Sequence, residues 1–208
     1  MNGDQIFNSI NNIQISIKNH KEEIEKLDQE IGDGDHIFNI LRGLDEILNL
    51  KEELMDKPID HIFKQLGMKI MTTVGGSSGA LFATLLIGMS KKYNSDLNAL
   101  HNLSEMFFEG VQSMKKRGKA DVGEKTMMDV LIPVSNCLKK GVEDNKDVKE
   151  ILKEAIEVAE KGMFSTKDLL ATKGRASFLG ERAKGHIDPG ARSSQLMIKT
   201  VCESVLNS

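Results

Sequence analysis

An apolar period of three to four residues runs through almost the whole chain. From Ile6 to Ile31 apolar side chains recur at these spacings without a change of phase, which predicts one long helix that ends at Ile31. Sustained alternation of β-branched or aromatic residues with polar ones is absent, so no strand is predicted. A chain of 208 residues suits one domain with a single core. We therefore expect an all-α domain over residues 1–208.

The same period continues between loops rich in glycine, proline and charge. After residues 6–31, it predicts helices over 35–49 and 58–73, one that starts at Ala80, others over 100–114, 127–138 and 148–163, and a terminal helix after Gly190. Short connections between about eight amphipathic helices are typical of an all-α bundle.

Composition excludes several classes of partner. The formal charge of −3 argues against a general nucleic-acid binder. The longest apolar stretch, Ala80 to Met89, is far too short to cross a bilayer, and no basic-then-apolar leader is present at the N-terminus. We therefore expect a cytoplasmic protein with neither a membrane nor a nucleic acid as its partner.

Three aspartates lie close together where the first predicted helix ends. Asp28 is followed by Gly32-Asp33-Gly34-Asp35-His36. Carboxylates this close repel one another unless a cation neutralises them, and oxygen ligands on a glycine-containing turn suit Mg²⁺, which commonly also binds phosphate. The alternative is a solvated acidic turn, because Asp-Gly turns are common. Asp28, Asp33 and Asp35 are therefore candidate metal ligands.

Three further irregular segments cover residues 75–79, 117–126 and 174–190. Loops alternate between the two ends of an antiparallel bundle, so the loops after the first, third, fifth and seventh helices gather at one end. The acidic turn and these three segments occupy those four places. We therefore expect all four to build one site at one end of the bundle.

The three segments carry groups that suit phosphate. Residues 75–79 read Gly-Gly-Ser-Ser-Gly before a helix, whose free N–H groups bind anions, although Ser78 as an ordinary N-cap is the alternative. Residues 118–126 come close to a P-loop, but Glu124 precedes Lys125-Thr126 and no strand comes before them, so we reject that match. Lys125 and Thr126 remain candidates for phosphate or base contacts. Residues 174–190 are rich in glycine and arginine, and each arginine taken alone is equally well explained as a surface charge.

No nucleophile with a neighbouring base is recognisable beside His36 or His186, so no catalytic residue is assigned. Metal-assisted phosphoryl transfer is the chemistry that uses all four segments. Carboxylates would hold Mg²⁺, glycines and hydroxyls would hold phosphate, and basic residues would stabilise developing charge.

Taken together, these segments resemble the nucleotide-binding L subunit of dihydroxyacetone kinases, the DhaL type. The similarity covers nearly the whole chain, and four motifs in family order are far more specific than any one. The matching stretches are Leu27-Asp28-Gln29-Glu30-Ile31-Gly32-Asp33-Gly34-Asp35-His36, Val74-Gly75-Gly76-Ser77-Ser78-Gly79, Gly118-Lys119-Ala120 with Gly123-Glu124-Lys125-Thr126-Met127, and Gly174-Arg175-Ala176-Ser177-Phe178-Leu179-Gly180-Glu181-Arg182 through Gly185-His186-Ile187-Asp188-Pro189-Gly190-Ala191.

The resemblance implies a barrel of eight amphipathic helices that holds ADP or ATP at one end. It places two Mg²⁺ ions between the phosphates and Asp28, Asp33 and Asp35. It also implies that a larger set of residues contacts the nucleotide: His36, Ile37, Phe38, Asn39, Ser77, Ser78, Gly118, Met127, Arg175, Asp188, Pro189 and Gly190. In the family a glycine usually follows the histidine. Here Ile37 and Phe38 do, and their bulk is expected to narrow the mouth of the nucleotide site or to alter how a partner docks.

The resemblance also implies a function. In the free-standing form of these kinases, the L subunit keeps its nucleotide as a cofactor. A phosphohistidine-carrying M subunit of the phosphotransferase system recharges ADP to ATP, which then phosphorylates dihydroxyacetone on a separate K subunit. A one-chain, ATP-dependent form adds a substrate domain, for which this chain has no room. Two alternatives stay open: a related kinase subunit for another small ketose or polyol, and a nucleotide-state sensor that acts on a regulator without turnover.

Overall fold

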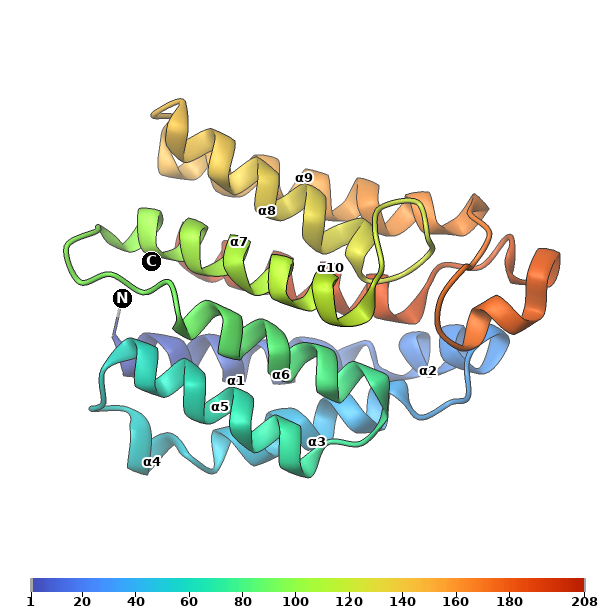
Figure 1. Cartoon of the computed structure of the whole chain (residues 1–208), viewed down its shortest axis with the longest axis horizontal. Helices are drawn as coiled ribbons and strands as arrows, with labels where there is room; N and C mark the ends of the chain where they lie inside the picture. The colour runs from blue at the N-terminus through green and yellow to red at the C-terminus, as the bar shows by residue number, and fades with distance from the viewer. Residues whose placement is uncertain (1, 208) are drawn as a thin grey trace.

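Residues 2–207 are described by a computed structural model, and their regular structure is helical throughout (Figure 1). The predicted all-α fold is therefore confirmed. The α-helices are α1 (Gly3–Asn19), α2 (Lys21–Ile31), α3 (His36–Leu48), α4 (Lys51–Leu54), α5 (Ile59–Thr73), α6 (Gly76–Ser90), α7 (Ala99–Gly118), α8 (Met128–Glu143), α9 (Val148–Ser165) and α10 (Pro189–Leu206), with 3₁₀ helices at Thr166–Asp168 and Arg175–Ala183.

Eight of the described helices close into a ring. In the order α1, α3, α5, α6, α7, α8, α9, α10, each helix contacts the next, and α10 contacts α1 again. Their apolar faces meet in one large core, in which Ile17, Ile62 and Val111 are completely buried. This is the eight-helix barrel that the family resemblance implied. The short helix α4 was not predicted.

The helix α6 lies between α5 and α7. A Cβ atom added to Gly88 of α6 would lie 2.9 Å from the Cα atom of Gly110 on α7. The two backbones therefore approach closely because both residues lack side chains. No helix among residues 2–207 is long and apolar enough to cross a membrane.

The prediction of one long first helix is wrong, because the helix is interrupted at His20, between α1 and α2. The His20 amide donates to Ile17 O rather than to Ser16 O, and His20 Nδ1 lies 2.8 Å from Ser16 O. The imidazole thus takes the carbonyl that an unbroken helix would pair with the His20 amide. The phase of the apolar residues is nearly the same on both sides, so the periodicity did not reveal the break. The helix α2 consequently carries the acidic turn beyond the end of α1 and packs against α3 and α10.

The four irregular segments do lie at one end of the barrel, as predicted. Figure 1 shows the α2–α3, α5–α6, α7–α8 and α9–α10 connections together at the right, opposite the end where the two termini lie. The helix that follows residues 75–79 starts earlier than expected, at Gly76 rather than Ala80. Its N-cap is Gly75 and not Ser78, and no side chain caps it. The first amides of α6 are therefore left without a side-chain partner.

Candidate functional site

The three aspartates converge. One carboxylate oxygen from each of Asp28, Asp33 and Asp35 lies within 4.8 Å of the other two. Asp28 is buried, and its Oδ2 accepts a hydrogen bond of 2.9 Å from the His36 amide at the start of α3. Asp35 occupies the N-cap position of α3, but its side chain makes no capping hydrogen bond. The first amide of α3 instead donates to Asp28. The Asp33 and Asp35 carboxylates are exposed. The set suits a hard divalent cation with open positions for water or phosphate.

Beside the carboxylates lies an amide donor without a partner. Asn39 is buried, and its Nδ2 makes no hydrogen bond, although its Oδ1 accepts one from Arg42. A Cβ atom added to Gly76 would lie 3.2 Å from Asn39 Nδ2 and 3.9 Å from Asp35 Oδ2. The φ angle of Gly76 is +74°, a conformation that favours glycine. The uncapped start of α6, with Ser77 and Ser78, therefore faces Asn39 and Asp35 across a gap that a side chain would close.

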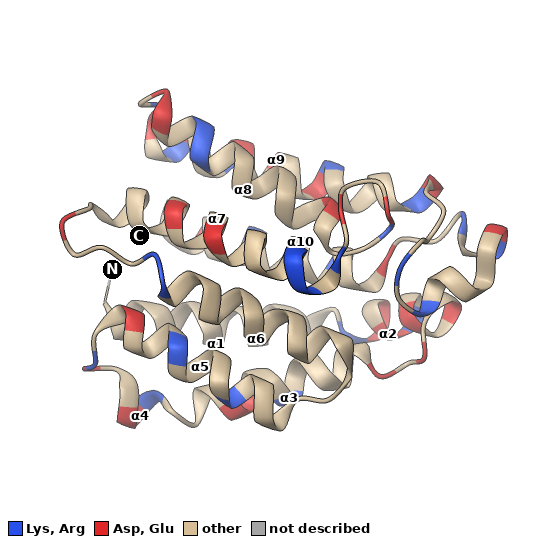
Figure 2. Cartoon of the chain, viewed as in Figure 1, with Lys and Arg blue, Asp and Glu red and all other residues tan. Residues whose placement is uncertain are grey.

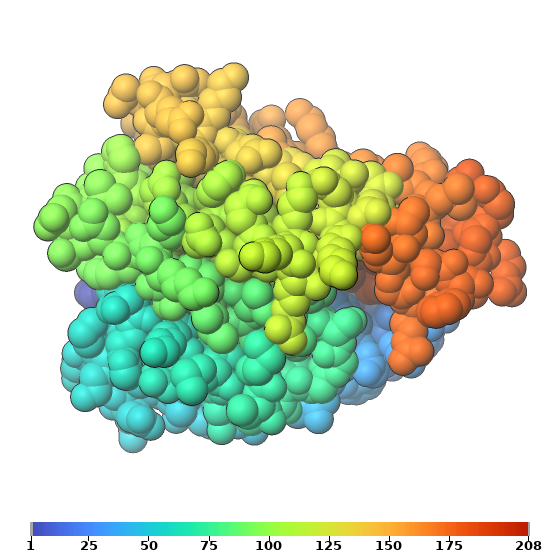
Figure 3. Space-filling view, viewed as in Figure 1, coloured from blue at the N-terminus to red at the C-terminus, as the bar shows by residue number. Residues whose placement is uncertain are grey.

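The segment between α9 and α10 covers the acidic turn from the other side. Arg175 Nε lies 2.8 Å from Asp33 Oδ2, and His186 Nδ1 pairs with Glu30 Oε2 on α2. A small separate core joins this segment to α2: Ile31 packs with Ala176 and Ala183. In Figure 2 the acidic residues of α2 and its turn lie beside basic residues of this segment. Figure 3 shows the segment in orange, projecting at the right end next to the blue surface of α2.

The Asp188-Pro189-Gly190 turn lies on the inner side of the site. Asp188 caps α10 by accepting a hydrogen bond of 2.7 Å from the Ala191 amide, and burial raises the pKa of its carboxyl to about 7. Ser193 is the fifth residue of α10, and its Oγ lies 2.9 Å from His36 Nε2. Burial lowers the pKa of His36, and the charges of Asp28 and Asp35 partly offset that effect. Ser193 Oγ also donates to Gly190 O at 3.1 Å, so this serine links the turn to the start of α3.

Gly118 and Met127, the two predicted contacts from the α7–α8 region, line a less polar part of the same end. A Cβ atom added to Gly118 would lie 3.1 Å from the side chain of Leu81 on α6. One added to Gly190 would lie 3.2 Å from the methyl carbon of Met127. Met127 therefore packs against the Asp188 turn. The surface here is made of glycine backbone and flexible apolar side chains, which suits the flat face of a group such as a base.

The two residues after the motif histidine behave differently from each other. Ile37 is completely buried in the core, so the expectation that it narrows the mouth of the site is wrong. Phe38 is 48% exposed, and the Lys21 ammonium lies 5.0 Å from the centre of its ring. The helical period explains the difference, because Ile37 lies on the inward face of α3 together with Ile40 and Leu44.

The near-P-loop segment is held by an aspartate that was not predicted from the sequence. Asp129 is buried and accepts hydrogen bonds of 2.5 Å from the Gly123 amide and 2.7 Å from the Thr126 amide. The Thr126-Met-Met-Asp129 spacing is that of a capping box, a signal by which it could have been found. Lys125 also turns inward and donates to main-chain carbonyls, so the expectation that its ammonium binds phosphate is wrong.

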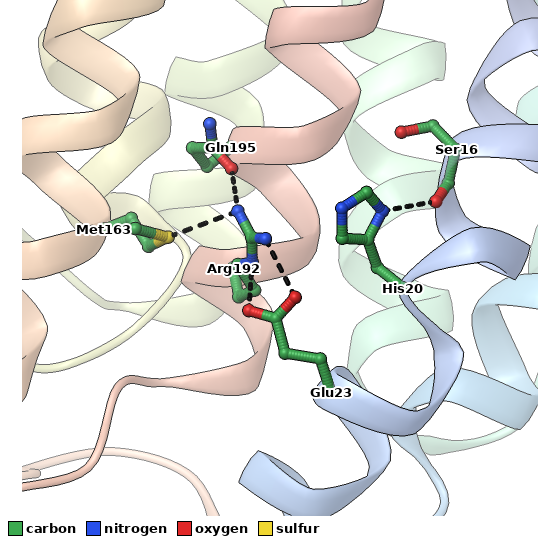
Figure 4. A network of polar contacts seen from close by, with 6 residues as sticks. All are labelled: Ser16, His20, Glu23, Met163, Arg192 and Gln195. Atoms are coloured by element: carbon green, nitrogen blue, oxygen red, sulfur yellow. Dashed lines mark hydrogen bonds and ion pairs between the residues drawn. The ribbon is translucent and has the colours of Figure 1, made fainter.

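An arginine at the start of α10 fixes α2 in place (Figure 4). Arg192 donates to both carboxylate oxygens of Glu23, at 2.7 and 2.9 Å, and to Gln195 Oε1 at 2.6 Å. The Arg192 side chain is only 16% exposed, so solvent screens this pair less than an open surface pair. Because α2 ends at the acidic turn, the Arg192–Glu23 pair helps to fix the position of that turn relative to the Asp188 turn.

Replacing Arg192 with methionine is expected to lower the free energy of unfolding by about 2 kcal/mol, since Gln195 and Glu23 both lose a charged donor. Urea unfolding of R192M, E23Q and the double variant should give a coupling energy of about 1 kcal/mol. The exposed pair Lys199–Glu203 on the same helix is the control, and K199M should change stability by less than about 0.5 kcal/mol. Equal effects of R192M and K199M would contradict the role given to Arg192.

The fold and the site together define an all-α barrel protein with an acidic, loop-built site at one end. The family model for the DAK2 domain matches residues 30–203. The chain therefore belongs to the DAK2 domain family.

Several known proteins are similar along nearly the whole chain. The ADP-binding subunit DhaL of phosphoenolpyruvate-dependent dihydroxyacetone kinase 1 from Listeria innocua is 40% identical over 94% of this chain and 93% of that subunit. The corresponding Escherichia coli subunit is 39% identical over the same shares of both chains. The solved dihydroxyacetone kinase of C. freundii in complex with AMP-PNP and Mg²⁺ superposes on 95% of this chain with a TM-score of 0.73 and 25% identity. This chain spans 33% of that kinase.

Proposed function

We propose that this chain is the ADP-binding subunit of a phosphoenolpyruvate-dependent dihydroxyacetone kinase. The relatives that it matches along nearly their whole length carry that name, at up to 40% identity. A similar one-chain dihydroxyacetone kinase, from Citrobacter freundii, is 30% identical and matches over 32% of its length. The similarity therefore favours the multi-subunit form, in which the nucleotide stays bound and is recharged.

The observation that carries the proposal is the convergence of Asp28, Asp33 and Asp35 beside the unpartnered Asn39 donor and the uncapped start of α6. Three carboxylates this close carry more negative charge than the single positive charge of Arg175 can neutralise, so the set favours a further cation. The fit supports Mg²⁺ on the carboxylates, and we propose two such ions. Bound Mg²⁺ would neutralise the phosphates and stabilise charge that develops during phosphoryl transfer.

In this proposal the protein positions the nucleotide and supplies no nucleophile. Asn39, Ser77, Ser78 and the first amides of α6 would donate to phosphate oxygens. Gly118, Met127 and the Asp188-Pro189-Gly190 turn would hold the base. Arg175, 70% exposed at its side chain, would leave Asp33 and stabilise phosphate charge. His36 holds the Asp28 and Ser193 segments together, and Ile37 and Phe38 would contribute main-chain contacts only.

The partners in this proposal are a K subunit that holds dihydroxyacetone and a phosphohistidine-carrying M subunit of the phosphotransferase system.

The first test of the proposal combines the purified chain with Mg²⁺ and ADP, and measures bound nucleotide by equilibrium dialysis with and without a chelator. Binding that needs Mg²⁺ is expected. Failure to bind ADP in Mg²⁺ would rule the proposal out.

Reconstitution then separates the enzyme from the alternatives. With a K subunit and an M subunit kept phosphorylated on histidine by the phosphotransferase system, triose phosphate should form only when this chain is present. ADP binding without any triose phosphate would favour a nucleotide sensor. Product formed from another ketose or polyol, and not from dihydroxyacetone, would favour a related kinase.

A further inference from the structure

Lys125 is a buried lysine whose charged group contacts main-chain carbonyls and no carboxylate. The residue is 1% exposed. Its Nζ donates to the carbonyl oxygens of Thr166, of His186 at 2.5 Å and of Lys167 at 3.5 Å. A lysine ammonium has three donors, and three carbonyls surround this one. No donor is left for a phosphate.

The three carbonyls come from the two ends of one segment. Thr166 and Lys167 begin the connection between α9 and α10, and His186 lies near its end, two residues before Asp188. The Gly185 amide also donates to Lys167 O at 2.8 Å. The Lys125 ammonium thus closes the base of the segment that carries Arg175 and covers the acidic turn.

The same contacts lead to the Asp188 turn. The Asp188 amide donates to Thr166 Oγ1 at 3.0 Å, and Thr166 is completely buried. Thr166 therefore binds Lys125 through its carbonyl and Asp188 through its hydroxyl. Displacing either contact would free the N-cap of α10 and the residues that follow it.

Core filling does not explain this lysine. A buried ammonium loses its hydration, a cost that an apolar residue of similar size would avoid. The backbone at Lys125 also has a φ angle of +60°, which is unusual for a residue other than glycine and costs of order 1 kcal/mol. Burial lowers the pKa of Lys125, and the charges of Asp188, Asp168 and Asp129 only partly offset that effect. The arrangement joins two connections at the site, α7–α8 and α9–α10, and strain of this kind is concentrated at functional sites.

We propose that Lys125 is a positioning residue that fixes the Asp188-Pro189-Gly190 turn and thereby slows release of the bound nucleotide. The inference rests on the proposed function, in which that turn contacts ADP. Lys125 itself touches neither the nucleotide nor Asp28, Asp33 and Asp35. Its loss is therefore expected to change nucleotide release and not the dependence of binding on Mg²⁺.

The test uses Lys125→Met in the full-length chain. Dissociation of a fluorescent ADP analogue is measured in stopped flow, and hydrogen exchange is followed by mass spectrometry on the protein without nucleotide. Dissociation should be about tenfold faster, the effect of losing one charged hydrogen bond. The Mg²⁺ concentration for half-maximal binding should be unchanged. Exchange should rise in peptides that cover 185–191 and not in those that cover 28–40.

Lys167→Met is the matched control, because that side chain is exposed in the same segment and only its main chain contacts Lys125. It should change neither measurement. Unchanged dissociation and unchanged exchange over 185–191 in Lys125→Met would overturn the proposal. Exchange that rises uniformly over the whole chain would overturn it too, because it would indicate general destabilisation.

A second variant keeps the test decisive if Lys125→Met does not fold. Thr166→Val removes the hydroxyl that accepts from the Asp188 amide and leaves the carbonyl and Lys125 in place. It should accelerate dissociation in the same direction by a smaller factor, and no acceleration would overturn the proposal. If the wild-type chain does not bind ADP, the proposed function fails, while the exchange measurement still decides whether Lys125 holds the turn.

Discussion

Asp33→Ala is expected to weaken Mg²⁺-dependent ADP binding at least a hundredfold, about 2.7 kcal/mol, so that the nucleotide no longer co-purifies with the chain. The substitution removes one of three clustered carboxylates, and the remaining two neutralise less of the metal charge. The fold should remain intact, because the Asp33 side chain is 41% exposed and its partner Arg175 stays in water. Without nucleotide the variant should be as stable as the wild type or slightly more stable, since carboxylate repulsion is relieved.

The measurement is titration calorimetry of ADP at saturating Mg²⁺, together with thermal unfolding in a chelator. Asp56→Ala is the control, because Asp56 is an exposed aspartate near α4, at the far end of the barrel. It should bind ADP like the wild type. An Asp33→Ala protein that still co-purifies with ADP and Mg²⁺ would show that the metal ligands are assigned wrongly.

The helices of the barrel could be predicted because helix-to-helix packing leaves a period in the sequence, whereas their closure into a barrel was implied only by the family resemblance. Each wall helix buries one apolar face, so its buried residues recur at spacings of three and four. The placement of the four loops then follows from antiparallel order alone. The break at His20 could not be predicted in this way, since it depends on one imidazole taking the Ser16 carbonyl. A local competition between side chain and main chain leaves the period unchanged.

Within the site, the residue types were predictable and most of their contacts were not. The close spacing of Asp28, Asp33 and Asp35 along the chain is enough to indicate a metal site. By contrast, Lys125 follows a glycine-rich segment and looks like a phosphate-binding lysine. Its actual partners are carbonyls 41 and 61 residues further along the chain. No local pattern records such contacts, because any residue type offers a main-chain carbonyl.

Gly32 has a specific role that only the structure reveals. Its φ angle is −121°, an ordinary value for any residue, so conformational freedom does not explain it. A Cβ atom at this position would lie 1.9 Å from Asp28 Oδ1 and 2.9 Å from Asp28 O. The Asp28 carboxylate is buried and bound to the His36 amide, so it has little room to move. The glycine therefore makes space for a candidate metal ligand.

Gly32→Ala is accordingly expected to displace the Asp28 carboxylate and to reduce Mg²⁺-dependent ADP binding by at least a hundredfold. It should also lower the free energy of unfolding by about 2 kcal/mol, because the His36 amide loses its acceptor. Titration calorimetry and urea unfolding measure the two effects.

Gly34→Ala provides the matched comparison in the same turn. Gly34 has a φ angle of +78°, yet only Gln29 Cγ, at 4.0 Å, lies near its added Cβ atom. Alanine there should cost about 1 kcal/mol of backbone strain and leave the carboxylates in place, so ADP affinity should fall less than tenfold. Greater loss of affinity in Gly34→Ala than in Gly32→Ala would mean that turn flexibility, and not room for Asp28, is what the glycines provide. The two variants thus separate conformational freedom from space in a turn where the sequence shows only two glycines.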